Sequence, residues 1–227
     1  MTNEELNNPV WHALAGPQAN WAERKGRAAR FVPDAAPFFA IDRAETQAYA
    51  DLAELLGGAA EARMFRPRAE ATPKGWRKTF EKPILQMVLP ADVRLLPEAP
   101  ELCTLGRDDL AGMMELVLAT KPGPFGPRTH ELGAYIGIRR DGRLVAMAGE
   151  RFRLSRHTEI SAVAVDPPER GRGLGRALTV VLAENIRGRG VTPLLHVFPD
   201  NTAALKLYQS IGFRARAELT IVWLAPA

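Results

Sequence analysis

The chain has 227 residues, of which 30 are Lys or Arg and 26 are Asp or Glu, giving a formal net charge of +4 at pH 7. This length can bury a sizeable core, and the weak positive balance suits an anionic small ligand but gives no argument for nucleic acid. One cysteine, Cys103, excludes a disulfide within the chain and is typical of a reducing setting. We find no signal peptide and no apolar run of about 18 residues, so we expect a cytoplasmic protein with no membrane or nucleic-acid partner.

Four segments of the first hundred residues have the pattern of regular elements. We predict strands over 37–41, 62–65 and 84–89 and a helix over 43–58. The stretch 66–82 contains two prolines and is expected to be partly irregular.

Three prolines at positions 90, 97 and 100 indicate the main boundary of the chain. Proline continues neither a helix nor a central strand. We therefore divide the chain into an N-terminal region, 1–100, and a second domain, 101–227.

The second domain alternates between helical and extended patterns. We predict helices over 107–120, 174–182 and 201–211, strands over 159–165, 193–198 and 219–224, a loop over 121–133, and a hairpin over 134–152. The hairpin is indicated by Asp141-Gly142 between two apolar runs. This order predicts an α/β (α+β) domain with a mixed sheet.

A glycine-rich loop lies between the strand at 159–165 and the helix that follows it. Gly171, Gly173 and Gly175 match neither the dinucleotide-binding fingerprint nor the P-loop. Backbone N–H groups and a helix N-terminus at this place still favour an anion. Three arginines surround the loop: Arg170, Arg172 and Arg176. A glycine-rich turn with solvated arginines is the alternative interpretation.

A second motif follows in NTAALKLYQSIGF, residues 201–213. On a helix, Asn201, Ala204 and Tyr208 are spaced i, i+3 and i+7 and share one face. That face could line a ligand, or Tyr208 could pack in the core of a plain amphipathic helix.

Together the two motifs resemble the GCN5-related N-acetyltransferases (GNAT), and within them the FR47-like group. The segment Arg170–Gly175 fills that family's pyrophosphate-binding pattern, while Asn201, Tyr208 and Gly212-Phe213 match its later motif. The resemblance covers about residues 105–224. It implies a GNAT fold, a mixed central sheet flanked by helices whose fourth and fifth strands splay to admit acetyl-CoA. Some FR47-like proteins carry a vestigial half of this fold at the N-terminus, which the region 1–100 would permit.

The resemblance implies an acetyl-CoA-dependent N-acetyltransferase that transfers the acetyl group directly to an acceptor amine. Tyr208 would be the general acid that protonates the leaving thiolate, and Glu159 a general base acting through water. Glu150 is a further candidate base, whereas His196, alone in an apolar strand, is more typical of a core residue. The implied acetyl-CoA-binding residues are Val163, Ala164, Val165, Arg170, Gly171, Arg172, Gly173, Leu174, Gly175, Arg176, Asn201 and Ala204. No spacing of His, Cys, Asp or Glu indicates a metal site.

The loop 121–133 falls where this family builds its acceptor pocket. Phe125, Arg128 and His130 are therefore candidate acceptor-binding residues, although a proline-rich surface loop explains them as well. The expected partner is a small-molecule or peptide amine, and a homodimer is compatible with the sequence.

Two rival functions remain open from the sequence. One is a catalytically idle acyl-CoA-binding or regulatory module of the same fold. The other is a nucleotide- or nucleic-acid-binding protein that uses the arginines beside the glycines. Tyr208 favours the enzyme but does not exclude the idle module.

Overall fold

Two β-sheets organise the chain in the computed structural model, which describes residues 4–96 and 101–227. The smaller sheet has the order β1-β2-β3, and the larger has eight strands in the order β4-β11-β5-β10-β9-β8-β7-β6. The strands are β1 (Ala22–Lys25), β2 (Ala28–Phe31), β3 (Phe39–Ile41), β4 (Ala62–Arg66), β5 (Trp76–Val88), β6 (Cys103–Thr104), β7 (Tyr135–Arg140), β8 (Arg143–Arg153), β9 (His157–Val165), β10 (Thr192–Val197) and β11 (Arg214–Pro226). The helices are α1 (Glu4–Asn7), α2 (Pro9–Leu14), α3 (Thr46–Leu56), α4 (Leu110–Thr120), α5 (Leu174–Gly188) and α6 (Thr202–Ile211), with 3₁₀ turns η1 (Ala19–Trp21), η2 (Arg107–Asp109), η3 (Thr129–Leu132) and η4 (Pro167–Glu169). The larger sheet is mixed, with β9 and β10 parallel, and the predicted fold class is confirmed.

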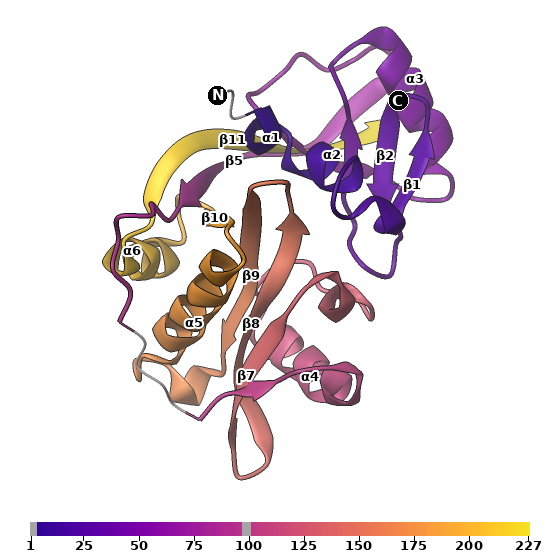
Figure 1. Cartoon of the computed structure of the whole chain (residues 1–227). Helices are drawn as coiled ribbons and strands as arrows, with labels where there is room; N and C mark the ends of the chain where they lie inside the picture. Colours follow the sequence, from indigo (N-terminus) through magenta and orange to yellow (C-terminus); the bar gives the residue numbers. More distant parts are fainter. Residues whose placement is uncertain (1–3, 97–100) are drawn as a thin grey trace.

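Helices α4 and α5 cover opposite faces of the strands β7, β8 and β9 (Figure 1). On α5, Leu178, Leu182 and Ile186 are fully buried, and their i, i+4, i+8 spacing places them along one face. On α4, Met113 and Leu116 belong to a separate buried cluster. Each fully buried side chain of this kind contributes about 2 kcal/mol. The centre of the sheet is therefore held rigidly from both sides.

The hairpin between β7 and β8 turns at Asp141 and Gly142, as predicted. Their φ angles are 49° and 78°, and a type I′ turn requires positive φ at both central residues. This turn fixes the register of two strands in the core of the larger sheet.

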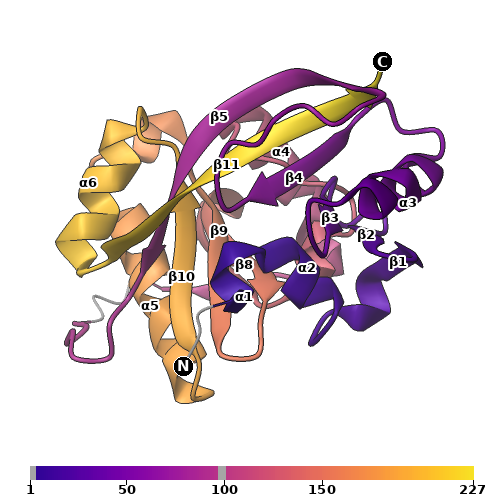
Figure 2. The ribbon, with the colours of Figure 1, turned by 90° about the horizontal axis from the view of Figure 1, so that it is seen from above.

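Strand β5 begins earlier than predicted. The stretch 66–82 is partly irregular, as expected, since no strand or helix covers 67–75. The predicted start of the strand at 84 is too late, because β5 begins at Trp76 and β11 pairs with it along its whole length. Pro83 is tolerated within β5 because β10 pairs with β5 only over Leu85–Val88; a proline costs least where the strand has one neighbour. Both long strands run from beside α6 to the N-terminal part of the molecule (Figures 1 and 2).

The N-terminal part packs directly on the larger sheet. Leu6, Val10 and Leu14 of α1 and α2 are buried against Phe65 of β4 and Phe152 of β8. Helices α1 and α2 and strands β1 and β2 have no counterpart among the predicted elements, whereas the predicted strand at 37–41 and helix at 43–58 correspond to β3 and α3.

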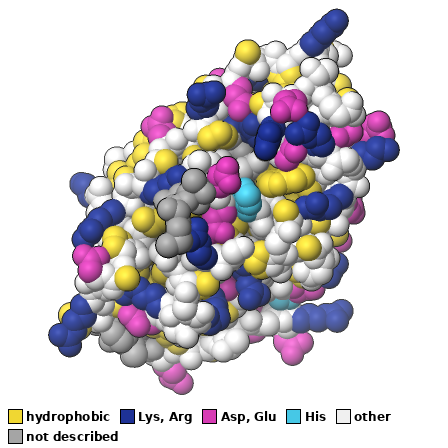
Figure 3. Space-filling view, turned by 45° about the horizontal axis from the view of Figure 1, so that its top comes forward, with side chains coloured by type: hydrophobic (Ala, Val, Ile, Leu, Met, Phe, Trp, Pro, Cys, Tyr) yellow, Lys and Arg dark blue, Asp and Glu magenta, His cyan; other side chains and the backbone are white. Residues whose placement is uncertain are grey.

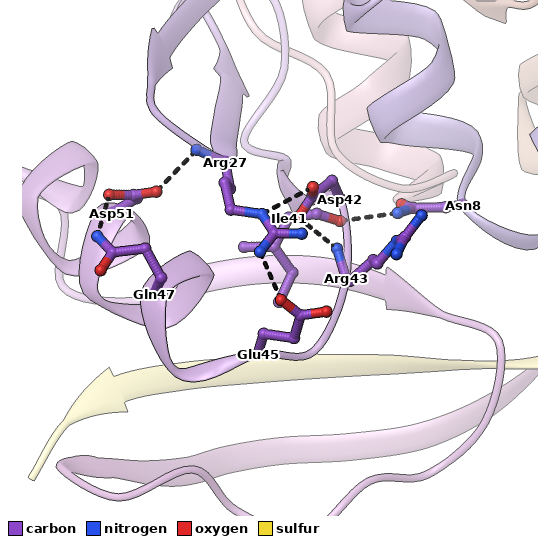
Figure 4. A network of polar contacts seen from close by, with 8 residues as sticks. All are labelled: Asn8, Arg27, Ile41, Asp42, Arg43, Glu45, Gln47 and Asp51. Atoms are coloured by element: carbon purple, nitrogen blue, oxygen red, sulfur yellow. Dashed lines mark hydrogen bonds and ion pairs between the residues drawn. The ribbon is translucent and has the colours of Figure 1, made fainter.

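A polar network joins the turn between β1 and β2 to helix α3 (Figure 4). The Arg27 N–H donates to Asp51 Oδ2 at 2.7 Å, and Gln47 Nε2 donates to Asp51 Oδ1 at 2.9 Å. The Arg27 guanidinium also donates to Asp42, from Nε to Oδ2, at 2.9 Å. These contacts stabilise the small sheet against α3.

The predicted boundary adjoins residues 97–100, which lie outside the described residues. The division into 1–100 and 101–227 therefore stays a prediction. Strands β4 and β5, from the first of these regions, belong to the larger sheet.

Positive and negative side chains are interspersed on the face of the molecule seen in Figure 3. None of the helices within 4–96 and 101–227 has both the length and the apolar character needed to span a membrane.

Candidate active site

A cleft opens where the parallel strands β9 and β10 part. The two strands pair only over His157–Glu159 and Thr192–Leu194. Beyond this point β9 continues along β8 to Val165, while β10 continues along β5. The cleft that follows has a volume of about 660 Å³. The predicted splay of these strands is confirmed.

A bulge in β9 shapes the wall of the cleft. Ala162 has a φ of 51°, and the register with β8 shifts between the pairs Met147–Ala164 and Gly149–Ser161. A left-handed residue other than glycine costs about 1 kcal/mol, so the surrounding packing must hold it. Residues 160–165 of β9 line the cleft along the edge that has no partner in β10.

The glycine-rich loop lies at one end of the cleft. Gly171 and Gly173 both have a φ of 77°, and Gly173 is the N-cap of α5. The Arg170 Nε donates to the carbonyl of Val165 at 3.2 Å, while Arg172 pairs with Glu169 at 3.4 Å.

The structure brings together seven of the twelve predicted acetyl-CoA-binding residues as cleft lining. These are Val163, Ala164, Val165, Arg170, Gly175, Asn201 and Ala204. The other five, Gly171, Arg172, Gly173, Leu174 and Arg176, belong to the same loop and first helical turn but do not line the cleft. Leu174 is buried in the core, and the Arg176 Nη1 donates to the carbonyl of Ser210 at 3.3 Å.

Helix α6 presents Tyr208 to the cleft. Asn201 caps this helix, since its Oδ1 accepts the Ala204 N–H at 3.2 Å. Tyr208 is 8% exposed and its ring lies edge-to-face with Phe213, with centroids 6.1 Å apart. Burial, and secondarily the charge of Glu159, raise the pKa of Tyr208 to about 12. The phenol is therefore protonated throughout the physiological range.

Glu159 lies beneath the cleft in a buried ionic network. It is 1% exposed; its two oxygens accept from Arg151 Nε and Nη2 at 2.8 and 2.7 Å, and one also contacts His196 Nδ1 at 2.7 Å. Burial raises the pKa of Glu159, but Arg151 and then His196 outweigh it and lower the pKa to about 2. Its carboxylate is therefore already committed to two partners.

The other ring nitrogen of His196 is also occupied. Its Nε2 lies 3.0 Å from Gln86 Nε2, which also donates to the carbonyl of Leu6 at 2.9 Å. Because a Gln amide nitrogen only donates, this arrangement assigns the proton to Nδ1 and the acceptor role to Nε2. The side chain of His196 is fully enclosed, which agrees with a core residue.

The far end of the cleft is aromatic, which the sequence motifs do not predict. Its lining includes Phe38, Phe65, Phe80, Phe198, Ile221 and Trp223, together with Arg63 and Arg151. The two-residue spacing of Arg63 and Phe65, and of Ile221 and Trp223, is the available sequence signal, because such residues share one face of a strand.

The predicted acceptor-binding residues lie outside this lining. Phe125 packs edge-to-face on Tyr135 at 5.8 Å, and Arg128 pairs with Glu131 at 2.9 Å. His130 Nδ1 is buried without a hydrogen-bond partner. The same loop instead contributes residues 121–124 to the cleft, and a role for the three predicted side chains stays a prediction.

Other candidate groups are engaged elsewhere. Glu150 is buried and pairs with Arg189 at 2.7 Å. The Cys103 Sγ lies on β6, 3.4 Å from the carbonyl of Gly137. Within the described parts of the chain, no three His, Cys, Asp or Glu side chains are grouped as a metal site would need.

Comparison with known proteins agrees with this geometry. Residues 135–224 match the family model described as FR47-like protein. A solved structure of a GNAT-family acetyltransferase from Novosphingobium aromaticivorans is 39% identical, with a TM-score of 0.89, and the match covers 98% of each chain. The chain therefore has the same overall fold as this relative over nearly its whole length.

Two curated relatives match over shorter segments. A mycothiol acetyltransferase from Thermobispora bispora is 52% identical over 56 residues, which are 24% of this chain and 19% of that protein. The N-alpha-acetyltransferase RimI of Mycobacterium tuberculosis is 40% identical over 108 residues, 44% of this chain and 66% of that protein. The chain thus spans less than two thirds of the length of these relatives. The near-complete match to the Novosphingobium structure establishes that the chain belongs to the GNAT family of acetyltransferases.

Proposed function

We propose that the protein is an acetyl-CoA-dependent N-acetyltransferase that transfers the acetyl group directly to an acceptor amine. The observation that carries this proposal is the cleft between β9 and β10, with the glycine-rich loop at one end and Tyr208 on its wall. The free edge of β9 offers backbone groups to the amides of the pantetheine arm, as an added strand would. The loop and the N-terminus of α5 offer N–H groups to its pyrophosphate.

In the transfer, the amine nitrogen forms a bond to the acetyl carbonyl carbon and the carbon–sulfur bond breaks. A backbone N–H near Val163 stabilises the negative charge that develops on the carbonyl oxygen. The attacking nitrogen becomes positively charged in the tetrahedral intermediate and releases one proton to solvent. Tyr208 donates its proton to the leaving thiolate and later regains one from solvent, so that the products are the amide and the CoA thiol. Burial raises the pKa of the Tyr208 phenol, and it also raises the pKa of a thiol beside it. The pKa values of the proton donor and of the leaving thiolate therefore rise together, so proton transfer between them stays feasible.

The amine reaches the cleft already deprotonated in this proposal. Arg63, Arg151 and Arg170 line the cleft, and no Asp or Glu of the described residues does. Nearby cations disfavour a further positive charge, so they favour the neutral amine over the ammonium ion. Glu159, with a pKa of about 2 and both oxygens bound, is poorly suited to accept the proton. We assign it the role of holding Arg151 and His196 in place.

The pH dependence tests this assignment. We expect kcat/KM for the amine to rise with pH until the solution pKa of the acceptor and then to stay level to at least about pH 10, because neither Glu159 nor Tyr208 titrates between about pH 4 and 10. Rates for an active acceptor and a fluorinated analogue with a less basic nitrogen should show the rise displaced with the amine. A rise at the same pH for both amines would show instead that a group of the protein accepts the proton.

Gly173→Asp tests the place of the loop. We expect at least a tenfold loss of CoA affinity, measured by calorimetry, because the new carboxylate would face the pyrophosphate where N–H groups now favour an anion. Gly190→Asp is the matched control: Gly190 has a φ of 75°, close to the 77° of Gly173, and both glycines have open space where a Cβ atom would stand. It should show the same backbone strain and unchanged CoA affinity. Equal affinity in both variants would contradict the loop assignment.

A thiol-release assay with acetyl-CoA and a panel of amines separates the enzyme from its rivals. Turnover on at least one amine supports the proposal. Tight acetyl-CoA binding without turnover on any acceptor would favour the idle module. Binding of ATP or a DNA duplex that CoA does not displace would favour the nucleotide-binding alternative.

A further inference from the structure

The far end of the cleft is formed by one face of the strands β4, β11 and β5, together with Phe38 and with Arg151 of β8. We call it the aromatic chamber, and its residues are Phe38, Arg63, Phe65, Phe80, Arg151, Ile221 and Trp223. In the sheet register, Trp223 lies opposite Arg63 on one side and Phe80 on the other, and Ile221 lies opposite Phe65. Alternate residues of a strand share a face. The intervening residues, such as Met64, Val222 and Leu224, pack on the other face in the cluster that contains α3.

The chamber is continuous with the place of the transfer. The ring of Phe65 lies 4.9 Å from the ring of His196, and His196 and Tyr208 line the same cleft. Neighbouring rings of the chamber also contact each other, with centroids 4.6 Å apart for Phe80 and Trp223 and 5.4 Å for Phe38 and Phe65. A molecule seated here places its amine toward Tyr208 and its apolar body among the rings.

Each arginine of the chamber binds a glutamate through two of its guanidinium nitrogens, and its third nitrogen remains available as a donor. Arg63 binds Glu61 through Nε and Nη2 at 3.3 and 3.1 Å, with its guanidinium 4.3 Å from the Trp223 ring. Arg151 binds Glu159 through Nε and Nη2 and lies 4.9 Å from the Phe38 ring. The Nη1 of each has no hydrogen bond to any residue that the structure describes. Glu61 and Glu159 do not line the cleft.

The charged side chains of the described residues that line the cleft are all positive. Arg63, Lys121, Arg151 and Arg170 line the cleft, and no acidic side chain from the described ranges does. Arg170 belongs to the glycine-rich loop at one end of the cleft, whereas Arg63 and Arg151 lie at the opposite, aromatic end. A polycationic acceptor would meet repulsion here, whereas a carboxylate would find guanidinium N–H donors.

We propose that the acceptor is a small primary amine that joins an aromatic ring to a carboxylate, of the size of an aromatic α-amino acid. The ring lies among Phe65, Phe80 and Trp223, and the carboxylate accepts from Arg63 and Arg151. Contacts between aromatic rings add to the stabilisation that comes from burying their area. The acceptor must also be small, because the cleft of about 660 Å³ has to hold the thioester arm as well. This inference rests on the proposed acetyl transfer and names its substrate class.

The test is a thiol-release assay with acetyl-CoA and five acceptors: phenylalanine, phenethylamine, alanine, spermidine and a peptide with an N-terminal alanine. We expect kcat/KM for phenylalanine to exceed that of each other acceptor at least tenfold. Phenethylamine lacks the carboxylate, alanine lacks the ring, and spermidine carries only positive charge. A higher kcat/KM for any of these, or for the peptide, would overturn the proposal.

Arg63→Met tests the carboxylate contact directly. The side chain of Arg63 is 34% exposed, and Met keeps an apolar stem over Trp223, so we expect a folded variant. The KM for phenylalanine should rise at least tenfold with kcat little changed. The KM for phenethylamine, which has no carboxylate and would lose only one of the cations near its amine, should change much less, and the Kd for acetyl-CoA should stay the same. Arg63→Lys should recover part of the loss.

Arg30→Met is the matched control, because Arg30 also pairs with a glutamate, Glu23, and lies over a ring, Phe39, but outside the cleft. Its kinetics should equal those of the wild type. An unchanged KM for phenylalanine in Arg63→Met would refute the carboxylate contact.

Calorimetry with acetyl-CoA distinguishes a failure of the proposed acetyl transfer from a failure of the proposed acceptor class. If acetyl-CoA binds and spermidine is the best acceptor, the acetyl transfer stands and the acceptor class is wrong. If acetyl-CoA does not bind, the acetyl transfer itself fails.

Discussion

Tyr208→Phe is expected to lower kcat about 100-fold, as is typical when one general acid is removed, while the Kd for CoA changes less than about twofold. The substitution removes only the hydroxyl, so the packing of the ring on Phe213 remains. Because the pKa of Tyr208 is raised to about 12, the wild type holds its proton at every pH of the assay. The loss should therefore be the same at pH 7 and pH 9.

Tyr49→Phe serves as the control for this substitution. Tyr49 also has a pKa raised to about 12, mainly by burial, but lies on α3 beside Trp76 and away from the cleft. Its kcat should equal that of the wild type. An unchanged kcat in Tyr208→Phe, measured by thiol release at saturating acetyl-CoA, would remove Tyr208 from the mechanism.

The donor end of the site could be predicted from the sequence because its determinants are local. The glycines before α5 and the spacing of Asn201, Ala204 and Tyr208 each lie within one turn or one helix. A short motif fixes the relative position of such residues. The hairpin at Asp141-Gly142 is predictable for the same reason.

The aromatic chamber could not be predicted in this way. Arg63 and Trp223 meet only because β4 and β11, from opposite ends of the chain, pair side by side. Nothing near either residue in the sequence specifies that partner. Strand β5 could be predicted only in part for a related cause. After Trp76 its first half alternates between exposed and half-buried residues, and its pairing with β11 rather than its apolar content makes it a strand.

The role of Glu159 also depends on contacts with the strands on either side of it. As a carboxylate at the start of a cleft-lining strand, it has the position expected of a base. Arg151 and His196, which lower its pKa, come from the two strands on either side, β8 and β10. The sequence shows the residue types but not that these three side chains meet.

Glu159→Gln is expected to lower the free energy of unfolding by about 3 kcal/mol at pH 7. Removing one partner of a buried ion pair leaves the other charge uncompensated, and Arg151 is 10% exposed. The change in the pKa of Glu159, from 4.5 in the unfolded chain to about 2 in the folded protein, corresponds to a stabilisation of similar size. Urea unfolding followed by circular dichroism measures it.

The same pKa change fixes how this difference varies with pH. A carboxyl whose pKa is lowered by folding stabilises the protein above its unfolded pKa and loses that contribution as pH falls toward its folded pKa. The wild type should therefore lose about 2 kcal/mol of its advantage over Glu159→Gln between pH 7 and pH 3, and the two should converge near pH 2. Glu131→Gln, which breaks the exposed pair with Arg128, should be much closer to the wild type at pH 7, because exposed pairs contribute little. A difference between the wild type and Glu159→Gln that stayed constant from pH 7 to pH 3 would show that Glu159 is not held as a buried carboxylate, and the assignment of Arg151 and His196 as its partners would fall with it.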